Sequence, residues 1–385
     1  MLNGHSHFCL IRKRYGLWSC DLRTAQEQRE LLFCHRLFPG GTYGGFVLAR
    51  IDAIKNYNDR LMIFAPVLIP TLNRHEHLKK CLESLSRCTW ADQTEVYVAL
   101  DYPPSEKYVE GWQKNKEFLE NCGNMGFKKL HVIQRKENYG TWNPGDKGNA
   151  RRLSWWIRKT HDRYITTEDD NVFSPNFLEY MNKGLEKFEN DDSVLSLCAF
   201  RWYFPIESDG NTFFRTNVSV TPWGMGYWTK KQKQIPRLDY KWYREQLSIR
   251  NLIKVYRKSG PSFMNALIEL SNADVSHSRA IDYHMAVYMI LSDLYQIIPV
   301  ESLVRNIGLD GSGNMPINDG KMQRLYDSIP TSNEAHFEFV GTGFECFDVN
   351  QRVYRKGRNW HSRGYYFVSF LKKWIRLIKY WKGKD

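Results

Sequence analysis

The sequence is poor in the patterns that mark several other classes of protein. No two of its eight cysteines form a Cys-x-x-Cys pair, which predicts reduced thiols and argues against a disulfide framework. No apolar run approaches the roughly 18 residues that a membrane-spanning helix needs. Residues 1–20 contain no continuous apolar stretch of the signal-peptide kind. These absences favour a cytoplasmic protein.

Zinc-finger spacing, an RNP-type strand, internal repeats and low-complexity tracts are also absent from the sequence. The net charge is +13, and such a basic balance points to an anionic partner, for example a membrane surface or a phosphorylated substrate. Because no nucleic-acid-binding motif accompanies the charge, we expect no nucleic-acid partner. Hydrophobic residues make up 42% of the chain and aromatic residues 15%, which is enough for a folded core.

The apolar periodicity of the chain changes sharply at Met62. Before this residue the sequence shows little periodicity, apart from a short helix expected near 24–34. After it, strand-like and helix-like segments follow one another. The predicted parts are a poorly ordered N-terminal extension (1–61), a functional domain (62–320), a C-terminal extension (321–364) and a basic amphipathic helix (365–385).

Within the functional domain, short apolar runs alternate with segments of helical spacing. The predicted strands are 63–70, 95–100, 130–134, 163–167, 194–200 and 295–299. The predicted helices are about 78–85, 106–122, 150–160, 174–188 and 281–292. In the fourth of these, Ser174 is the predicted N-cap and Pro175 lies in the first turn. Residues 205–260 are expected to be irregular. The alternation predicts an α/β fold with a mostly parallel sheet, which binds ligands at the carboxyl ends of its strands.

Three consecutive acids, Glu168, Asp169 and Asp170, follow directly on one of the predicted strands. Adjacent carboxylates repel one another, and folding tolerates them when they are solvated or bound to a cation. Oxygen ligands suit a hard cation such as Mn²⁺ or Mg²⁺, which keeps coordination positions open for phosphate oxygens. The pattern therefore predicts a metal-bound diphosphate. The alternative is an acidic helix start favoured by the helix dipole.

With these motifs the sequence resembles the GT-A glycosyltransferases, in particular the N-acetylglucosaminyltransferase I type and bacterial enzymes of glycan synthesis, over about 62–315. The resemblance implies a Rossmann-like sheet. It also implies that Pro70, Thr71 and Arg74 line the nucleotide pocket and that Asp101 lies near the base or ribose. In the Glu-Asp-Asp motif, it makes Asp170 the direct metal ligand, with Asp169 and Glu168 beside it.

The resemblance extends to residues beyond the acids. It implies that Trp223, Gly224 and Tyr227 bind the acceptor, although core aromatics would give the same pattern. It points to Asp282 as the general base, with Asp310 as its rival and a helix-start acid as the alternative. Lys147, Arg151 and Arg152 open a helix after a glycine-containing loop. They are candidates for diphosphate contacts, and a solvated helix face is the alternative.

The function that this reading predicts is metal-dependent, inverting transfer of a hexose or N-acetylhexosamine. The donor is a nucleotide-diphosphate sugar, and the acceptor is a hydroxyl of a glycan or lipid-linked molecule. A retaining transferase on the same fold is one alternative. A sugar nucleotidyltransferase is another, but that class usually carries glycines at the first strand-to-helix turn, where this chain has Pro70-Thr-Leu-Asn-Arg.

The last segment of the chain has an apolar stripe at three- and four-residue steps. Its members are Phe367, Phe370, Leu371, Trp374, Ile375, Ile378 and Trp381. The bases Lys372, Lys373, Arg376 and Lys379 lie between them. A helix of this kind lies in a membrane interface, and we expect it to hold the protein peripherally on the inner face of the membrane. The alternative is a terminal helix docked on the protein's own core.

Overall fold

The computed structural model describes residues 62–140, 148–201, 208–217, 221–259, 261–272, 281–313 and 327–345, the backbone of 9–13 and 16–20, and the single positions 324, 368, 371, 372, 374, 375 and 378. The chain divides into two units, Met1–Met62 and Ile63–Asp385. In the first unit, β1 (Cys9–Lys13) pairs antiparallel with β2 (Gly16–Cys20). The sequence did not predict this hairpin, and the helix expected near 24–34 lies outside the described residues.

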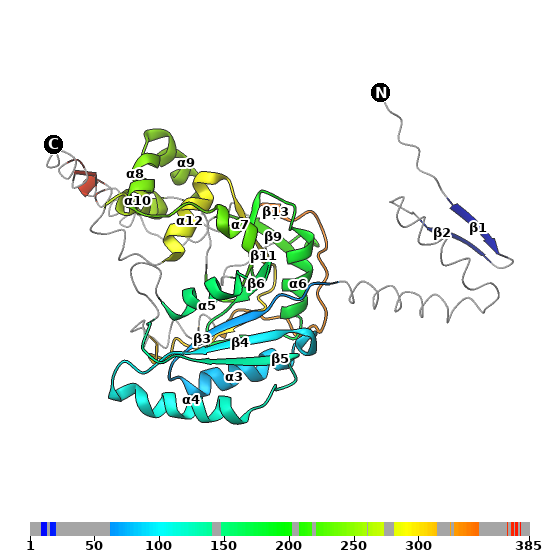
Figure 1. Cartoon of the computed structure of the whole chain (residues 1–385). Helices are drawn as coiled ribbons and strands as arrows, with labels where there is room; N and C mark the ends of the chain where they lie inside the picture. Colours follow the sequence, from blue (N-terminus) through cyan, green and yellow to red (C-terminus); the bar gives the residue numbers. More distant parts are fainter. Residues whose placement is uncertain are drawn as a thin grey trace. The chain divides into compact units, whose positions relative to one another are not determined.

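The second unit is built on a sheet of nine strands (Figure 1). In chain order these are β3 (Val67–Thr71), β4 (Glu95–Leu100), β5 (Lys129–Gln134), β6 (Arg163–Thr166), β8 (Val194–Cys198), β9 (Phe213–Thr216), β10 (Met225–Trp228), β11 (Tyr295–Pro299) and β13 (Phe344–Glu345). Their order in the sheet is β13-β9-β11-β8-β10-β6-β3-β4-β5. Strand β10 is antiparallel to both of its neighbours and β9 is antiparallel to β11, whereas the other five pairs are parallel. The predicted α/β fold with a mostly parallel sheet is confirmed.

Helices cover both faces of this sheet because its strands are apolar on both sides. They are α3 (His75–Ser86), α4 (Val109–Asn121), α5 (Asn149–Ile157) and α6 (Phe177–Lys187), with short 3-10 turns η1 (Ala91–Gln93) and η2 (Glu106–Tyr108). Apolar residues of α3, α4 and α6 join the larger core on one face, and Leu153 and Ile157 of α5 join Leu68 and Tyr164 on the other.

The start of α6 differs from the prediction. Its N-cap is Asn176, and the helix begins at Phe177 rather than at Ser174-Pro175. The two earlier residues are tied to other segments, since Ser174 N donates to Leu303 O at 3.0 Å and Pro175 O accepts from Thr89 N at 2.8 Å. These contacts keep the residues out of the helix.

A group of helices with its own core lies beside the sheet (Figure 1). It contains α8 (Tyr240–Gln246), α9 (Ile249–Ser259), α10 (Pro261–Leu270) and α12 (Ile281–Ser292), and α7 (Thr229–Gln234) leads into it. The expectation that residues 205–260 are irregular is wrong, because β9, β10 and α7 to α9 all lie there. In the described part of the chain, no helix is both long and apolar enough to cross a membrane.

Residues 327–345 pack on the domain that carries the sheet. Ile329 and Phe337 belong to its larger core, Phe339 stacks on Tyr180 with ring centroids 5.3 Å apart, and β13 pairs with β9. The sequence placed these residues in a C-terminal extension. In the structure they complete one edge of the sheet.

Candidate functional site

The candidate site lies where β3 and β6 end. These two strands are parallel neighbours, with Val67 opposite Ile165 and Leu68 opposite Thr166. Parallel strands bring their carboxyl ends to the same edge of a sheet. Strand β6 is followed by Glu168, Asp169 and Asp170, which are called the acid cluster from here on. The turn from Thr71 to Arg74 begins at the last residue of β3. The acid cluster and this turn therefore meet.

Two acids of the cluster are held by three side chains, two from the turn after β3 and one from a later segment. Thr71 Oγ1 donates to Asp169 Oδ2 at 2.7 Å. Arg74 Nη1 donates to Asp170 Oδ2 at 2.7 Å, and Arg74 Nη2 donates to Asp169 Oδ1. Asn306 Nδ2 completes the set by donating to Asp170 Oδ1 at 2.8 Å. Each of the four carboxylate oxygens of Asp169 and Asp170 thus accepts a hydrogen bond.

Burial and charge alter the acidity of these groups. Burial, together with the charge of Asp170, raises the pKa of Glu168 to about 8, although the hydrogen bond from Trp223 acts in the opposite direction. Burial also raises the pKa of Asp169, against the lowering effect of Arg74. Burial alone would lower the pKa of Arg74, but the charges of Asp169 and Asp170 raise it above its ordinary value. Arg74 is therefore a permanent cation.

A two-stranded sheet positions Asp170 at the end of the acid cluster. Strand β7 (Asn171–Phe173) pairs antiparallel with β12 (Val304–Asn306), which sets Asn306 opposite Asn171. Ile307 N then donates to Asp170 O at 2.9 Å. At Gly308 a Cβ atom would lie 1.9 Å from Asp170 Oδ2, so only glycine fits there. No local pattern in the sequence predicted these roles of Asn306 and Gly308.

The turn after β3 is supported by α4, a contact that the sequence did not predict. At Gly111 of α4 a Cβ atom would lie 2.1 Å from Asn73 O, so glycine allows the helix to approach the turn closely. Buried Asn115 donates to Leu72 O at 3.3 Å and lies 3.4 Å from Thr71 Oγ1. These contacts position the turn that carries Thr71 and Arg74.

The three residues predicted to bind the acceptor have different surroundings. Trp223 Nε1 donates to Glu168 Oε2 at 2.8 Å, and its ring meets Phe200 edge-on, which places it at the acid cluster. Gly224 has a φ of +74°, and a Cβ atom there would lie 2.9 Å from Phe177 Cε2, so packing and backbone geometry explain the glycine. Tyr227 lies in β10 and its ring is 5.5 Å from that of Tyr164. Trp223 thus contacts the acid cluster directly.

Asp101 follows β4 at the same edge of the sheet and is buried. Its carboxylate accepts from Gly140 N at 2.8 Å, from Tyr139 N at 3.0 Å and from Asn138 Nδ2 at 3.3 Å. Asp101 therefore fastens the 138–140 loop at the position where the resemblance places a base or ribose. Pro70, one residue before the end of β3, is half-buried and pairs with Ala99.

Of the three basic residues predicted to contact diphosphate after this loop, the structure describes Arg151 and Arg152. Arg152 in α5 stacks on the Tyr139 ring, 3.8 Å from its centroid. Arg151 lies on the exposed side of α5. Lys147 lies outside the described residues, so the prediction that it contacts diphosphate stays a prediction.

The structure describes the side chain of Asp310 but, for the other candidate base, Asp282, only the backbone. Asp282 lies in the first turn of α12, and its side chain is outside the described residues. Asp310 Oδ1 accepts from Ser312 Oγ at 2.6 Å and Ser312 N at 2.9 Å, and Oδ2 lies 3.2 Å from His77 Nε2. Burial acts to raise the pKa of Asp310, but these hydrogen bonds and the His77 charge lower it overall. A carboxylate stabilised in this way is a weak base.

Comparisons with known proteins give only structural similarities. No family model and no curated relative matches the chain. Similar solved structures include S. aureus TarS (17% identity, TM-score 0.31, covering 45% of this chain and 30% of that chain). TarS 1–349 in complex with UDP is another (16%, 0.30, 43% and 47%). A third is the mannosyltransferase PcManGT from Pyrobaculum calidifontis in complex with GDP-Man and Mn²⁺ (13%, 0.32, 80% and 86%). These TM-scores are too low to establish a shared fold.

The carboxylate oxygens of the acid cluster supply some of the ligands that a hard cation needs. Asp169 and Asp170 supply only oxygen, and Mg²⁺-like ions bind one or two carboxylates and take further ligands from phosphates and water. Among the described residues, no group of three or more His, Cys, Asp or Glu side chains is arranged to hold a metal alone. Arg74 already contacts both aspartates. A cation fits here if Arg74 releases Asp170 and phosphate oxygens of a bound ligand complete the coordination shell.

Proposed function

We propose that this chain is a glycosyltransferase that uses a nucleotide-diphosphate sugar. The observation that carries the proposal is the joining of the acid cluster after β6 to Thr71 and Arg74 after β3. Ligands of open α/β sheets bind at this edge. The Glu-Asp-Asp motif and the order of the motifs around it, which resemble those of GT-A enzymes, support the same reaction class.

The acid cluster and Arg74 have complementary tasks in this reaction. Asp170, with Asp169 beside it, would hold Mn²⁺ or Mg²⁺. When bound, the cation neutralises the charge that develops on the leaving diphosphate. Arg74, once it has released Asp170, can donate hydrogen bonds to a phosphate oxygen, because a guanidinium pairs with phosphate as well as with carboxylate. Thr71 keeps Asp169 in place during this exchange.

The finer steps form part of the same proposal. Asp282, in the first turn of α12, is the candidate base that takes the proton from an acceptor hydroxyl. The transfer is then a direct displacement with inversion. Trp223 holds Glu168 and offers an indole face to an acceptor sugar. The sugar is a hexose or N-acetylhexosamine, and the acceptor is a glycan or lipid-linked molecule on the cytoplasmic face of a membrane. The anomeric configuration of the product separates this route from a retaining one.

Calorimetric titration with UDP and GDP, each with Mn²⁺ and with a chelator, tests the proposal. Asp170→Asn keeps the shape of the side chain and removes its charge. Asp209→Asn is the matched control, since Asp209 is exposed and has a φ of +46°, a conformation that asparagine also adopts. We expect Mn²⁺ to tighten binding of one nucleotide in the wild type and in Asp209→Asn, but not in Asp170→Asn.

Donor turnover with UDP- and GDP-sugars then identifies the reaction. Release of nucleoside diphosphate that needs Mn²⁺ and Asp170 supports sugar transfer. Binding of neither nucleotide by the wild type, or binding that Asp170→Asn leaves unchanged, would contradict the proposal. Release of pyrophosphate from a nucleoside triphosphate and a sugar phosphate would assign the chain to the nucleotidyltransferases instead.

A further inference from the structure

Helix α9 has one broad apolar face, and the small core beside it covers only part of this face. Leu252 and Val255 are buried in that core. Ile249, Ile253 and Tyr256 continue the same face at three- and four-residue steps, and they are 74%, 47% and 53% exposed. This uncovered part of the apolar face is therefore open to solvent over two turns.

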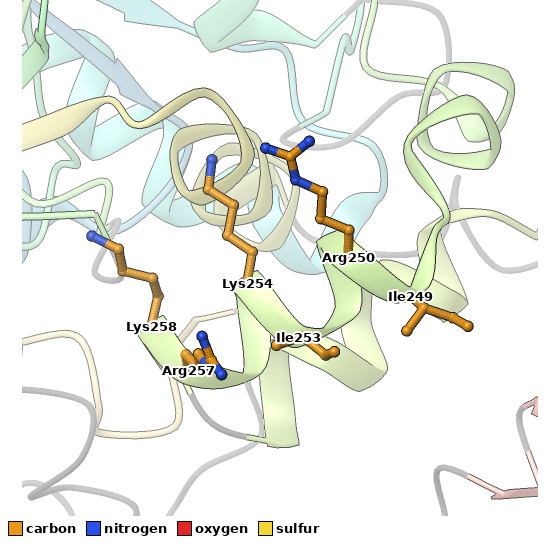
Figure 2. A pocket seen from close by; sticks show the side chains of 6 residues that line it. All are labelled: Ile249, Arg250, Ile253, Lys254, Arg257 and Lys258. Atoms are coloured by element: carbon orange, nitrogen blue, oxygen red, sulfur yellow. The ribbon is translucent and has the colours of Figure 1, made fainter.

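Basic residues lie next to this open face. Figure 2 shows Arg250, Lys254, Arg257 and Lys258 on the same helix as Ile249 and Ile253. These six residues line an open groove of about 740 Å³. Lys254 also pairs with Asp293 at 2.7 Å, whereas Arg250 and Arg257 are exposed. Residues 249–259 contain no acid. The helix thus presents an apolar stripe bordered by cations.

The C-terminal residues add a second exposed apolar set to the same group of helices. Trp374 packs against the core that contains Leu252 and Val255. The neighbouring helical positions Val368, Leu371 and Ile375 are exposed. Of the described residues in the predicted C-terminal stripe, Trp374 is therefore docked on the protein, whereas Leu371 and Ile375 are exposed.

This combination fits one kind of partner best. A helix with an apolar stripe and flanking Arg and Lys residues lies in the interface of an anionic bilayer. A nucleic acid would be attracted by the charges but would leave Ile249 and Ile253 in water, because phosphates dominate such binding. A second copy of the chain would set these cations against each other, since α9 has no acid to pair with them. The charge and the apolar stripe both match a lipid surface.

We propose that α9 docks this protein on an anionic membrane through Ile249, Ile253 and Tyr256, with Arg250 and Arg257 at the lipid headgroups. The exposed residues Val368, Leu371 and Ile375 supply a second attachment, and two attachments together bind more stably than one. This surface is separate from the acid cluster, so the proposal does not depend on the reaction proposed above.

Flotation of the full chain with vesicles tests the docking. Vesicles of phosphatidylcholine with phosphatidylserine are compared with phosphatidylcholine alone. The apolar variant is Ile249→Ser with Ile253→Ser, and its control is Ile63→Ser with Val109→Ser, two other exposed apolar residues. The basic variant is Arg250→Glu with Arg257→Glu. Its control is Lys79→Glu with Lys80→Glu, two exposed bases of α3 with the same change in charge.

We expect the wild type and both controls to float with the anionic vesicles only. Both α9 variants should bind these vesicles about tenfold more weakly or worse. The basic variant loses charges that attract the anionic surface, and the apolar variant loses side chains that insert into the interface. All variants should keep their nucleotide affinity. Wild-type flotation by the α9 variants would overturn the proposal, as would failure of the wild type to float. If the wild type binds duplex DNA and the α9 variants do not, the surface belongs to a nucleic-acid partner instead. If the wild type is a dimer that the apolar variant dissociates, the surface belongs to a second copy of the chain.

Discussion

Gly308 offers a way to disturb the acid cluster without changing any charge. In Gly308→Ala the new Cβ atom would lie 1.9 Å from Asp170 Oδ2 and 2.6 Å from Asp170 Cγ. Asp170 cannot rotate away freely, because Asn306 holds its Oδ1 at 2.8 Å and Ile307 N holds its backbone oxygen at 2.9 Å. The carboxylate or the loop must therefore move by about 1 Å, and a misplacement of this size costs about 100-fold in turnover.

The loop provides a control for this experiment. At Gly313 a Cβ atom would lie 3.4 Å from Arg74 Nη1, close to ordinary contact, so Gly313→Ala should keep near-normal turnover. Overpacking at Gly308 should also lower the free energy of unfolding by about 1–3 kcal/mol. Steady-state kinetics with the donor, together with urea unfolding of both variants, measures the two effects. Normal turnover in Gly308→Ala, or an equal loss in Gly313→Ala, would refute the reasoning.

Three further predictions concern other parts of the chain. Trp223→Phe removes the hydrogen bond to half-buried Glu168 and should lower the free energy of unfolding by about 0.5–1.5 kcal/mol; an unchanged urea midpoint would contradict this. Asp282→Asn should reduce turnover by ~10²-fold with donor affinity unchanged, whereas Asp310→Asn should leave turnover near normal; steady-state kinetics showing the reverse would make Asp310 the base. A chain that starts at Met62 should fold and transfer sugar, because the unit from Ile63 onward has its own cores; insolubility of this chain beside a soluble full-length protein would argue against it.

The central strands could be predicted from the sequence because their apolar runs are short and bounded by turn residues. Residues 95–100 and 295–299 were predicted with the bounds that β4 and β11 have. The alternation of strands with helices then led to the mostly parallel sheet. Helix α9 was missed because basic residues stand between its apolar residues, although Ile249, Leu252, Ile253 and Tyr256 follow helical spacing. Its helical pattern becomes clear once Leu252 and Val255 are seen in the second core.

The candidate site was predictable where its residues are consecutive or follow a strand. The acids at 168–170 belong to this part, and the resemblance added Thr71 and Arg74. Asn306 and Gly308 were missed because their role depends on the pairing of β7 with β12, two strands of three residues each that lie far apart in the sequence. No local pattern marks such a pairing. Gly111 and Asn115 were missed for a similar reason, since they act by contact between α4 and the turn after β3.

The charges of the site bear on how a donor would bind. Asp169 and Asp170 are buried beside one guanidinium, that of Arg74. When both aspartates are ionised, two negative charges face one positive charge in a region where water screens little. A free diphosphate would add further negative charge and meet repulsion. A donor that arrives with a divalent cation avoids this repulsion, because the cation can take over Asp170 from Arg74 and leave the guanidinium for the phosphates. The arrangement of Arg74 between the two acids therefore favours joint entry of cation and donor over entry of the donor alone.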